Sequence, residues 1–379
     1  MRNGWVEYKF KDVATAVKGK LPKSKNEDGI GIPYLTASYL RSNKPDYWIE
    51  NLEGAVTAED SDCLILWDGA GAGDLFSAHR GVVSSTMAVV TTQNSKILRE
   101  FLTLYISSKA EYIKETCRGT TVPHVSPDAI ANMDLKIPPL PEQKRIVDLI
   151  SSVDSYIEAL QQQLESAKRS RNAVLHELLT AGGDDWVETT LDGIAEVVMG
   201  QSPDGKTYNQ EGKGLPFMQG SAEFGEHNPV PEKWCSDPKK IAEPGDLLLS
   251  VRAPVGDTNF ADQRIAVGRG LSIIRANKES LTEFIRLVIQ LNVVELLASS
   301  GSGMFSSITG KNLKEFKVNL PPLPEQKRIV EIVNTIDEVI SQTELTTSKA
   351  QNLRSGLLSD LLSGEYEIPV TYDKVMGAA

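Results

Sequence analysis

PPLPEQKRIV (Pro138–Val147) occurs a second time, without change, at Pro321–Val330, 183 residues further along the chain. Each copy opens a stretch in which apolar side chains recur every three or four positions, over Pro141–Thr180 and Pro324–Ser363. This spacing predicts two long helices. A proline suits a first helical turn, where its missing N–H is no loss, and the glutamate that follows it lies near the positive end of the helix dipole.

The apolar positions of both helices follow a repeat close to 3.5 residues over about five heptads, which is typical of a helix-pairing seam. A helix of this length spans roughly 60 Å if straight, which is too long for an ordinary core helix. We therefore expect a paired-helix spacer. The polar residues Thr343 and Thr347 interrupt the second seam, so we expect weaker packing in the middle of that helix.

The remainder of the chain is also duplicated. WVEYKF at Trp5 is matched by WVETTL at Trp186, and the correspondence continues through strand-like runs at Val82–Val90 and Ile265–Ile274 to helices starting near Phe101 and Phe284. Short β-like runs alternate with one or two helices, which predicts two globular units of mixed α/β class. The expected boundaries are residues 1–137 and 184–320 for the globular units, 138–183 and 321–364 for the long helices, and 365–379 for a tail.

Composition indicates a globular protein, with 379 residues, 40% of them hydrophobic and 24% charged. No apolar run approaches the length needed to cross a bilayer, and the first ten residues lack the apolar core of a secretory signal. Cys63, Cys117 and Cys235 are far apart and have no metal-ligand spacing. We expect reduced thiols, no metal site and a cytoplasmic protein.

The formal net charge of −11 at first argues against nucleic acid as a ligand. Residues 1–140, however, carry 16 basic and 17 acidic side chains, whereas residues 184–323 carry 14 and 19. Local charge decides DNA binding, so the overall acidity does not exclude it. The acidity does predict that the chain alone binds DNA weakly.

Motifs for catalysis are absent from the sequence. It contains no GxxxxGK[ST] phosphate loop, no GxGxxG after a strand and no HExxH. The stretch Gly69–Gly73 is interpreted as a turn, because neither the lysine nor the helix of a phosphate loop follows it. We expect no catalytic residue and no cofactor site in this chain.

The chain resembles the specificity subunit of type I restriction-modification systems. The resemblance covers nearly the whole chain and is carried by both decapeptides, the helices after them and the paired Trp-Val-Glu openings. The loops RGTTVPHVS (Arg118–Ser126) and GSGMFSSIT (Gly301–Thr309) also match the family pattern. It implies that each globular unit is a target-recognition domain for one half of a split double-stranded DNA site. It also implies that the long helices pack antiparallel and dock two modification subunits, which are adenine methyltransferases, with or without motor-nuclease restriction subunits.

Base edges are read mainly by basic, amide and hydroxyl side chains on loops and helix ends. By this criterion the DNA-binding candidates are Lys18, Lys20, Lys23, Arg80, Arg118, Thr120, Thr121 and His124 in the first unit and Arg252, Arg269, Ser302, Ser306, Ser307 and Lys311 in the second. Each of these sets is equally compatible with solvated loops, and the isolated arginines with structural ion pairs.

The decapeptides are identical even at polar positions, which favours a shared partner. The candidates for docking the modification subunits are therefore the residues expected on the exposed faces of the helices, Gln143, Lys144, Arg145, Gln326, Lys327 and Arg328. Two other functions remain open at this point. One is a helical scaffold that joins two protein partners without reading DNA, and the weaker one is a nuclease or methyltransferase without recognisable motifs.

Overall fold

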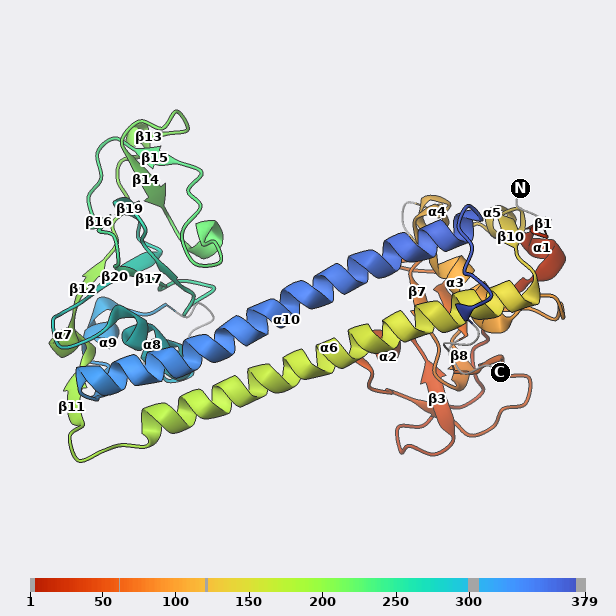
Figure 1. Cartoon of the computed structure of the whole chain (residues 1–379), viewed down its shortest axis with the longest axis horizontal. Coiled ribbons are helices and arrows are strands. Elements are labelled where there is room, and N and C mark those ends of the chain that lie inside the picture. Colours follow the sequence, from red (N-terminus) through yellow and green to blue (C-terminus); the bar gives the residue numbers. More distant parts are fainter. Residues whose placement is uncertain (1–3, 61, 120–121, 299–306, 373–379) are drawn as a thin grey trace. The chain divides into compact units, whose positions relative to one another are not determined.

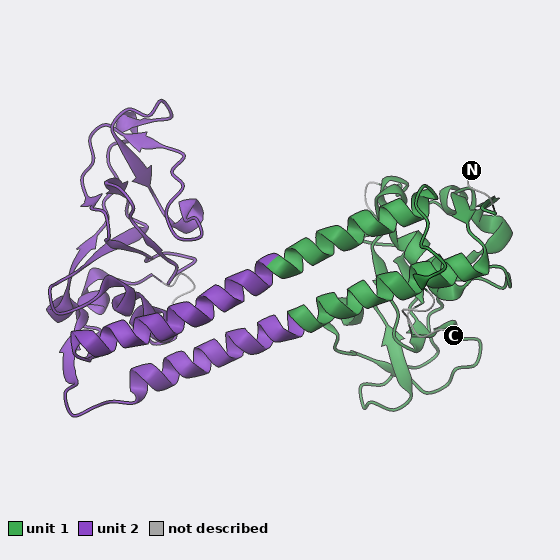
Figure 2. Ribbon diagram, in the orientation of Figure 1, with its two compact units in different colours: residues 1–160, 346–379 green, residues 161–345 purple. Residues whose placement is uncertain are grey.

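The computed structural model describes residues 4–60, 62–119, 122–298 and 307–372. Its contacts divide the chain into two compact units (Figure 2). Unit 1 contains residues 1–160 and 346–379, and unit 2 contains residues 161–345. The sequence-based boundaries lie at the ends of the long helices, whereas the contacts divide each long helix near its middle. Each unit is therefore described by itself.

Unit 1 begins with a globular part that contains three β-sheets. Strands β2, β9, β6 and β7 form an antiparallel sheet in that order, β4-β3-β8-β5 form a second sheet, and β1 pairs with β10. The strands are β1 Val6–Lys9, β2 Thr15–Lys18, β3 Ile32–Leu35, β4 Trp48–Ile49, β5 Thr57–Ala58, β6 Cys63–Leu66, β7 Leu75–Ser77, β8 Gly81–Val83, β9 Met87–Thr91 and β10 Asp134–Ile137. The short helices are α1 Phe10–Val13, α2 Ala37–Ser42, α3 Arg99–Ser107, α4 Ala110–Glu115 and α5 Pro127–Ala131.

Unit 2 repeats this plan. The antiparallel sheet is β12-β20-β17-β18, the second sheet gains a strand as β13-β15-β14-β19-β16, and β11 pairs with β21. The strands are β11 Val187–Thr190, β12 Ala195–Met199, β13 Tyr208–Asn209, β14 Leu215–Met218, β15 Trp234–Cys235, β16 Ile241–Ala242, β17 Leu247–Ser250, β18 Thr258–Phe260, β19 Ile265–Val267, β20 Leu271–Ala276 and β21 Lys317–Leu320. The helices are α7 Leu191–Ile194, η1 Gly205–Thr207, η2 Ser221–Glu223, α8 Thr282–Ala298 and α9 Gly310–Lys314. Helix α8 is interrupted by non-helical dihedrals at Asn292, where unit 1 has the break between α3 and α4.

The mixed α/β class and the duplication predicted from the sequence are confirmed, but one predicted element is wrong. The strand-like runs Val82–Val90 and Ile265–Ile274 are not single strands. Each run breaks into two strands that belong to different sheets, β8 and β9 in unit 1 and β19 and β20 in unit 2. The cause is a tight turn between the two strands, made of Ser84-Ser85-Thr86 in the first copy and Gly268-Arg269-Gly270 in the second.

The long helices are α6 Leu140–Thr180 and α10 Leu323–Ser363, each starting one residue before the predicted proline (Figure 1). In unit 1, Ile146 and Ile150 of α6 share a core with Leu358 and Leu362 of α10. Further along α6, Ile157 and Leu160 share a cluster with Ala350, which lies earlier in α10. Numbers that rise along one helix fall along the other, so the helices are antiparallel.

Unit 2 shows the same antiparallel pairing. Leu175 and Leu179 of α6 share a core with Ile329 and Val333 at the start of α10. The seam threonines are not exposed interruptions, because Thr343 is 9% and Thr347 is 7% accessible. Thr343 donates its hydroxyl to the carbonyl of Val339, one turn back in the helix, which satisfies the hydroxyl group within the buried seam.

Each unit also contains one copy of the same inter-helix ion pair. In unit 1, Arg354 donates Nε and Nη2 to the two carboxylate oxygens of Asp154 at 2.5 and 2.9 Å. In unit 2, Arg171 makes the same two bonds to Asp337 at 2.6 and 3.0 Å. The two aspartates are separated by the 183 residues that separate the decapeptides, and so are the two arginines. The repeat therefore places Asp on one helix against Arg on the other in both units, as in a self-complementary twofold interface.

Among the described residues, no helix is both long enough and apolar enough to span a lipid bilayer.

Candidate nucleic-acid interface

Eight of the fourteen DNA-binding candidates lie at one end of the antiparallel sheet, four in each unit. We call this end the loop edge: in unit 1 it contains residues 18–20, 67–68, 84–86, 118–119 and 122–124. Three backbone hydrogen bonds hold it together. Gly19 N–H donates to the carbonyl of Met87 at 2.9 Å, Trp67 N–H to Thr86 at 2.7 Å, and Val125 N–H to Trp67 at 2.9 Å. The last of these ties the closing loop, distant in sequence, to the end of β6.

Four of the candidates present side chains at the loop edge of unit 1, namely Lys18, Lys20, Arg118 and His124, and all four are exposed. Arg118 and His124 face each other across a small hairpin, exchanging backbone hydrogen bonds of 2.9 and 2.8 Å. Sequence analysis missed Asp68, which forms an ion pair with Lys18 at 2.5 Å. The loop edge of unit 1 therefore exposes Arg118, Lys20 and His124, together with the ion pair of Lys18 and Asp68.

The predicted turn at Gly69–Gly73 follows β6 in unit 1, and the structure confirms it, with Ala72 N–H bonded to the carbonyl of Gly69 at 2.9 Å. The turn ends at Asp74, which accepts hydrogen bonds from Lys114 and Arg41. These two cations lower the pKa of the Asp74 carboxyl. The turn is thus fixed by structural ion pairs.

Unit 2 has the equivalent loop edge, made of residues 200–202, 251–252, 268–270 and 307–311. The same three hydrogen bonds recur: Gly200 N–H to Leu271 at 2.9 Å, Val251 N–H to Gly270 at 2.9 Å, and Ile308 N–H to Val251 at 3.0 Å. Here too the described end of the closing loop is tied to the strand exit. The loop edge is therefore a property of the repeat.

Four candidates from distant parts of the sequence lie on this second edge: Arg252, Arg269, Ser307 and Lys311, all exposed. Among the residues that the structure describes, no carboxylate lies within 4.0 Å of Arg252 or Arg269. The ion-pair alternative considered for these two arginines is therefore not supported. Lys311 lies 3.8 Å from Glu315, one turn further along α9.

Two candidates are held by acidic neighbours away from the strand exits. Arg80 lies in the β7–β8 connection at the opposite end of the sheet, where its backbone N–H bonds Asp60 and its side chain is 3.9 Å from Glu59. Lys23 pairs with Glu53 at 3.6 Å, with both side chains largely exposed. DNA contact by these two residues stays a prediction. Four further candidates lie outside the described residues, namely Thr120, Thr121, Ser302 and Ser306.

The closing loops end in helix caps. Ser126 accepts a hydrogen bond from Ala129 N–H at the start of α5, and Thr309 accepts one from Asn312 N–H at the start of α9. Unsatisfied N–H groups at helix starts favour Ser and Thr at these positions. Helix capping thus accounts for the similarity between the C-terminal ends of the two closing loops.

The expected exposure of the decapeptide glutamines is wrong. Gln143 and Gln326 are both 0% accessible, and Arg145 is 8% accessible. Gln143 donates to the carbonyls of Lys96 and Pro138 and accepts from Leu98 N–H. Gln326 makes the same three bonds in unit 2, to Glu279, Pro321 and Leu281. Because each buried amide must bond three backbone groups, these bonds restrict the position to glutamine as strongly as core packing restricts a position to an apolar residue.

Burial therefore removes the reason for assigning the two glutamines and Arg145 to a docking surface. The remaining docking candidates, Lys144, Lys327 and Arg328, are exposed. Arg328 also approaches Glu325 on its own helix at 3.4 Å. Partner contact by these three residues stays a prediction.

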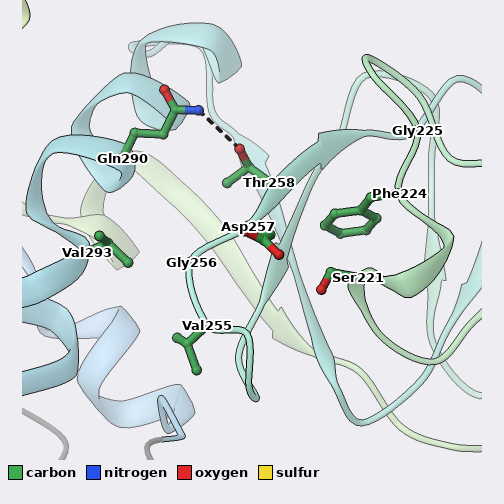
Figure 3. Close-up of a pocket in the computed structure, with 9 residues that line it drawn as sticks. All are labelled: Ser221, Phe224, Gly225, Val255, Gly256, Asp257, Thr258, Gln290 and Val293. Carbon is green, nitrogen blue, oxygen red and sulfur yellow. Dashed lines mark hydrogen bonds between the residues drawn. The ribbon is translucent and has the colours of Figure 1, made fainter. Parts of the chain in front are cut away.

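A hollow of about 560 Å³ lies beside the β17–β18 connection of unit 2 (Figure 3). It is lined by Ser221, Phe224, Gly225, Val255, Gly256, Asp257, Thr258, Gln290 and Val293. One carboxylate, Asp257, belongs to this lining, and no histidine, cysteine or lysine does. Gln290 donates to Thr258 at 3.5 Å across its wall. The lining thus contains no nucleophile paired with a histidine base, as acyl-transfer sites require.

In the described part of the chain, no group of three or more His, Cys, Asp or Glu side chains is arranged to bind a metal ion. Burial raises the pKa of the Cys63 thiol to about 12, so this cysteine stays protonated and is a poor nucleophile.

The family model described as type I restriction modification DNA specificity domain matches residues 2–169 and again residues 183–353. The chain belongs to this family. Its two matches coincide with the two halves of the internal repeat, each with its own loop edge. The chain is thus a type I specificity subunit, the component that recognises DNA.

Relatives support this assignment over nearly the full length. The putative type I restriction enzyme MjaX specificity subunit of Methanocaldococcus jannaschii is 28% identical, over 96% of this chain and 94% of the relative. The EcoBI specificity subunit of Escherichia coli is 21% identical, over 96% and 87%.

Among solved structures, a chain from a study of complex assembly and conformational transition of the type I R-M system has a TM-score of 0.67. It is 25% identical and covers 96% of this chain and 98% of its own length. The HsdS subunit of Thermoanaerobacter tengcongensis has a TM-score of 0.50, is 26% identical and covers 97% and 98%. Both likenesses extend through the globular units and the long helices.

Proposed function

We propose that each loop edge of this specificity subunit reads one half of a bipartite, asymmetric DNA target. The observation that carries the proposal is the presence of two edges with the same backbone hydrogen bonds and different side chains. Unit 1 presents Arg118 and His124 on its edge, whereas unit 2 presents Arg252 and Arg269. Since base edges are distinguished by the donors and acceptors they meet, two different edges read two different half-sites.

The complex that acts on this target contains two adenine methyltransferase subunits, and restriction subunits join it for cleavage. The chain itself supplies recognition and no catalytic group, and it acts in the cytoplasm with the DNA it reads. This division of labour accounts for the net charge of −11, because the partners supply the cationic surface that neutralises phosphates. The exposed residues Lys144, Lys327 and Arg328 at the starts of the long helices are our docking candidates.

Exchange of residues 1–137 for the same unit of a related specificity subunit tests the proposal. We expect one half of the methylated site, mapped by methylome sequencing of cells that carry the whole system, to change and the other half to stay. Methylation of the same complete site before and after the exchange would contradict it. Methyl transfer by the purified chain alone would contradict the non-catalytic role.

Arg118 gives a sharper test within unit 1. If its guanidinium makes a bidentate base contact, Arg118→Ala should lose roughly 1–3 kcal/mol of binding to the cognate site and relax specificity at one position. Affinity would be measured for the complex with its methyltransferase subunits, on cognate and unrelated duplexes. Arg99→Ala is the control, since Arg99 is exposed, is not a DNA-binding candidate and pairs with Asp62 at the other end of β6. Equal losses on both duplexes would assign Arg118 to a phosphate or structural role.

A further inference from the structure

We infer that Arg269 reads a guanine in the half-site recognised by unit 2. The inference rests on the proposed function and makes it specific, by assigning one side chain on one loop edge to one base. Arg269 lies in the turn between β19 and β20, where the sequence reads Gly268-Arg269-Gly270.

The backbone of this turn is fixed on several sides. Gly268 N–H donates to the carbonyl of Met218 at 2.8 Å, and Gly270 N–H donates to that of Gln219 at 3.2 Å. The carbonyl of Gly270 in turn accepts from Val251 at 2.9 Å. The turn is therefore anchored to two neighbouring strand ends, β14 and β17, and the Cα of Arg269 has a defined position.

Side chains brace the same turn. Ser202 Oγ accepts from the backbone N–H of Arg269 at 3.3 Å and donates to Gln219 Oε1 at 3.1 Å. Preorganised backbone of this kind reduces the entropy lost when a side chain binds. Sequence analysis selected Arg269 but missed Ser202 and Gln219, since neither stands in a recognisable motif.

Because glycines flank it on both sides, Arg269 is the only residue of the turn Gly268-Arg269-Gly270 that carries a side chain. A Cβ atom at Gly270 would lie 2.3 Å from the backbone oxygen of Gln219, and one at Gly268 would lie 3.1 Å from its Cα. A side chain at Gly270 would collide with the backbone of Gln219, and one at Gly268 would require Gln219 to shift. Arg269 is the one residue of the three that has a side chain to present, and it is exposed.

Three other arginines of unit 2 form ion pairs within the described part of the chain, which Arg269 does not. Arg171 and Arg275 make bidentate ion pairs with Asp337 and Asp246, and Arg264 pairs with Glu243. Arg269 has no carboxylate within 4.0 Å in the part of the chain that the structure describes. Its guanidinium is thus available for an external acceptor.

Guanine fits this side chain because its O6 and N7 atoms form a pair of acceptors in the major groove, which a planar guanidinium meets with two parallel hydrogen bonds. Unit 1 has Ser84-Ser85-Thr86 in the same turn, and Ser85 N–H donates to the hydroxyl of Tyr34 at 3.2 Å. The equivalent turn of unit 1 therefore cannot make the arginine–guanine contact. The guanine contact that depends on Arg269 should therefore be confined to the half-site of unit 2.

The test uses the complete system with Arg269→Ala, Arg269→Lys and Arg264→Ala. Arg264 is the matched control, because it is an exposed arginine of the same unit that already pairs with Glu243. Methylome sequencing defines the wild-type target, and binding of the reconstituted complex is then measured on duplexes that carry each base at each position of that target. Thermal unfolding of the variants confirms that the fold is retained.

We expect Arg269→Ala to weaken binding to the cognate duplex about 5- to 150-fold and to make one guanine position of the unit 2 half-site degenerate. Arg269→Lys should keep affinity for unrelated DNA but lose most of the guanine preference, because an ammonium group makes no planar bidentate contact. Arg264→Ala should bind and methylate as the wild type does.

An equal loss of affinity on cognate and unrelated duplexes would overturn the inference and make Arg269 a phosphate contact. So would a degenerate position in the half-site of unit 1, or an unchanged target. In all three cases the wild-type complex still methylates a bipartite site. Failure of the proposed function is a different result, namely a wild-type complex that shows no sequence preference.

Discussion

Replacement of Gln326 by methionine should lower the free energy of unfolding by about 3 kcal/mol, although the two side chains have similar volumes. The Gln326 amide bonds the carbonyls of Glu279 and Pro321 and the N–H of Leu281. Methionine satisfies none of them, and each buried polar group that loses its partner costs about 1–3 kcal/mol. We expect less than the full sum because Glu279 is exposed, so that solvent can replace the hydrogen bond lost by its carbonyl.

Urea unfolding of the full chain, followed by circular dichroism, measures this effect. Gln143→Met should cost a similar amount, since Gln143 makes the same three bonds in unit 1. Lys327→Ala is the control at the adjacent, exposed position and should change stability by less than about 0.5 kcal/mol. If both glutamine variants are as stable as this control, the buried amides do not hold the helix starts in place.

The loss of stability should be measurable in the free chain, without any partner subunit. Because the amide ties the start of α10 to the segment before α8, its removal loosens the junction between a long helix and a globular unit. If Gln326 instead contacted a methyltransferase subunit directly, its replacement would weaken assembly and leave the stability of the free chain unchanged. The two measurements therefore distinguish the sequence-based interpretation from the structural one.

The sequence predicted the long helices, the duplication and the mixed α/β units, because each leaves a periodic or repeated pattern. It failed at Val82–Val90, because apolar strand residues stand on both sides of the short polar turn Ser84-Ser85-Thr86 and the whole stretch was interpreted as one strand. Gly268-Arg269-Gly270 was the visible signal of that turn in the second copy. Comparison of the two copies at this position would have located the break in both.

The candidate site was predicted only in part, for a related reason. Arg252, Arg269 and Ser307 are distant in the sequence, and only the pairing of β12, β20 and β17 brings their neighbourhoods to one edge. Residues that are brought together by strand pairing leave no repeating pattern in the sequence. Identity between the decapeptides was misleading for Gln143 and Gln326, because a buried hydrogen-bonding amide and an exposed partner contact both constrain a glutamine.

The largest contrast between the two copies of the repeat should appear at the inter-helix ion pairs. Asp337→Ala should lower the free energy of unfolding by about 3 kcal/mol, whereas Asp154→Ala, at the equivalent position in unit 1, should cost about 1 kcal/mol. Removal of one partner leaves the other charge without compensation, and the penalty grows with burial. The side chain of Arg171 is 16% accessible, whereas that of Arg354 is 27% accessible.

A second cation increases the cost in unit 2. Arg286 stacks on Phe260 with its guanidinium carbon 5.6 Å from the ring centroid, and its Nε has no hydrogen-bond partner among the described residues. Desolvation lowers the pKa of Arg286, while the charge of Asp337 opposes this shift. Asp337 thus compensates two partly buried arginines. At the equivalent position unit 1 has Thr103, which carries no charge.

The double variant Asp337→Ala/Arg171→Met separates the pair from the rest of the helix seam. With the guanidinium of Arg171 removed as well, its uncompensated charge is gone, and we expect at least half of the lost stability to return. Arg171 also donates to Gln290 at 3.4 Å, so recovery should remain incomplete. A double-mutant cycle in urea gives the coupling energy. Equal costs for Asp337→Ala and Asp154→Ala, without recovery in the double variant, would show that the two pairs contribute as ordinary surface ion pairs and that burial of Arg171 and Arg286 does not set their strength.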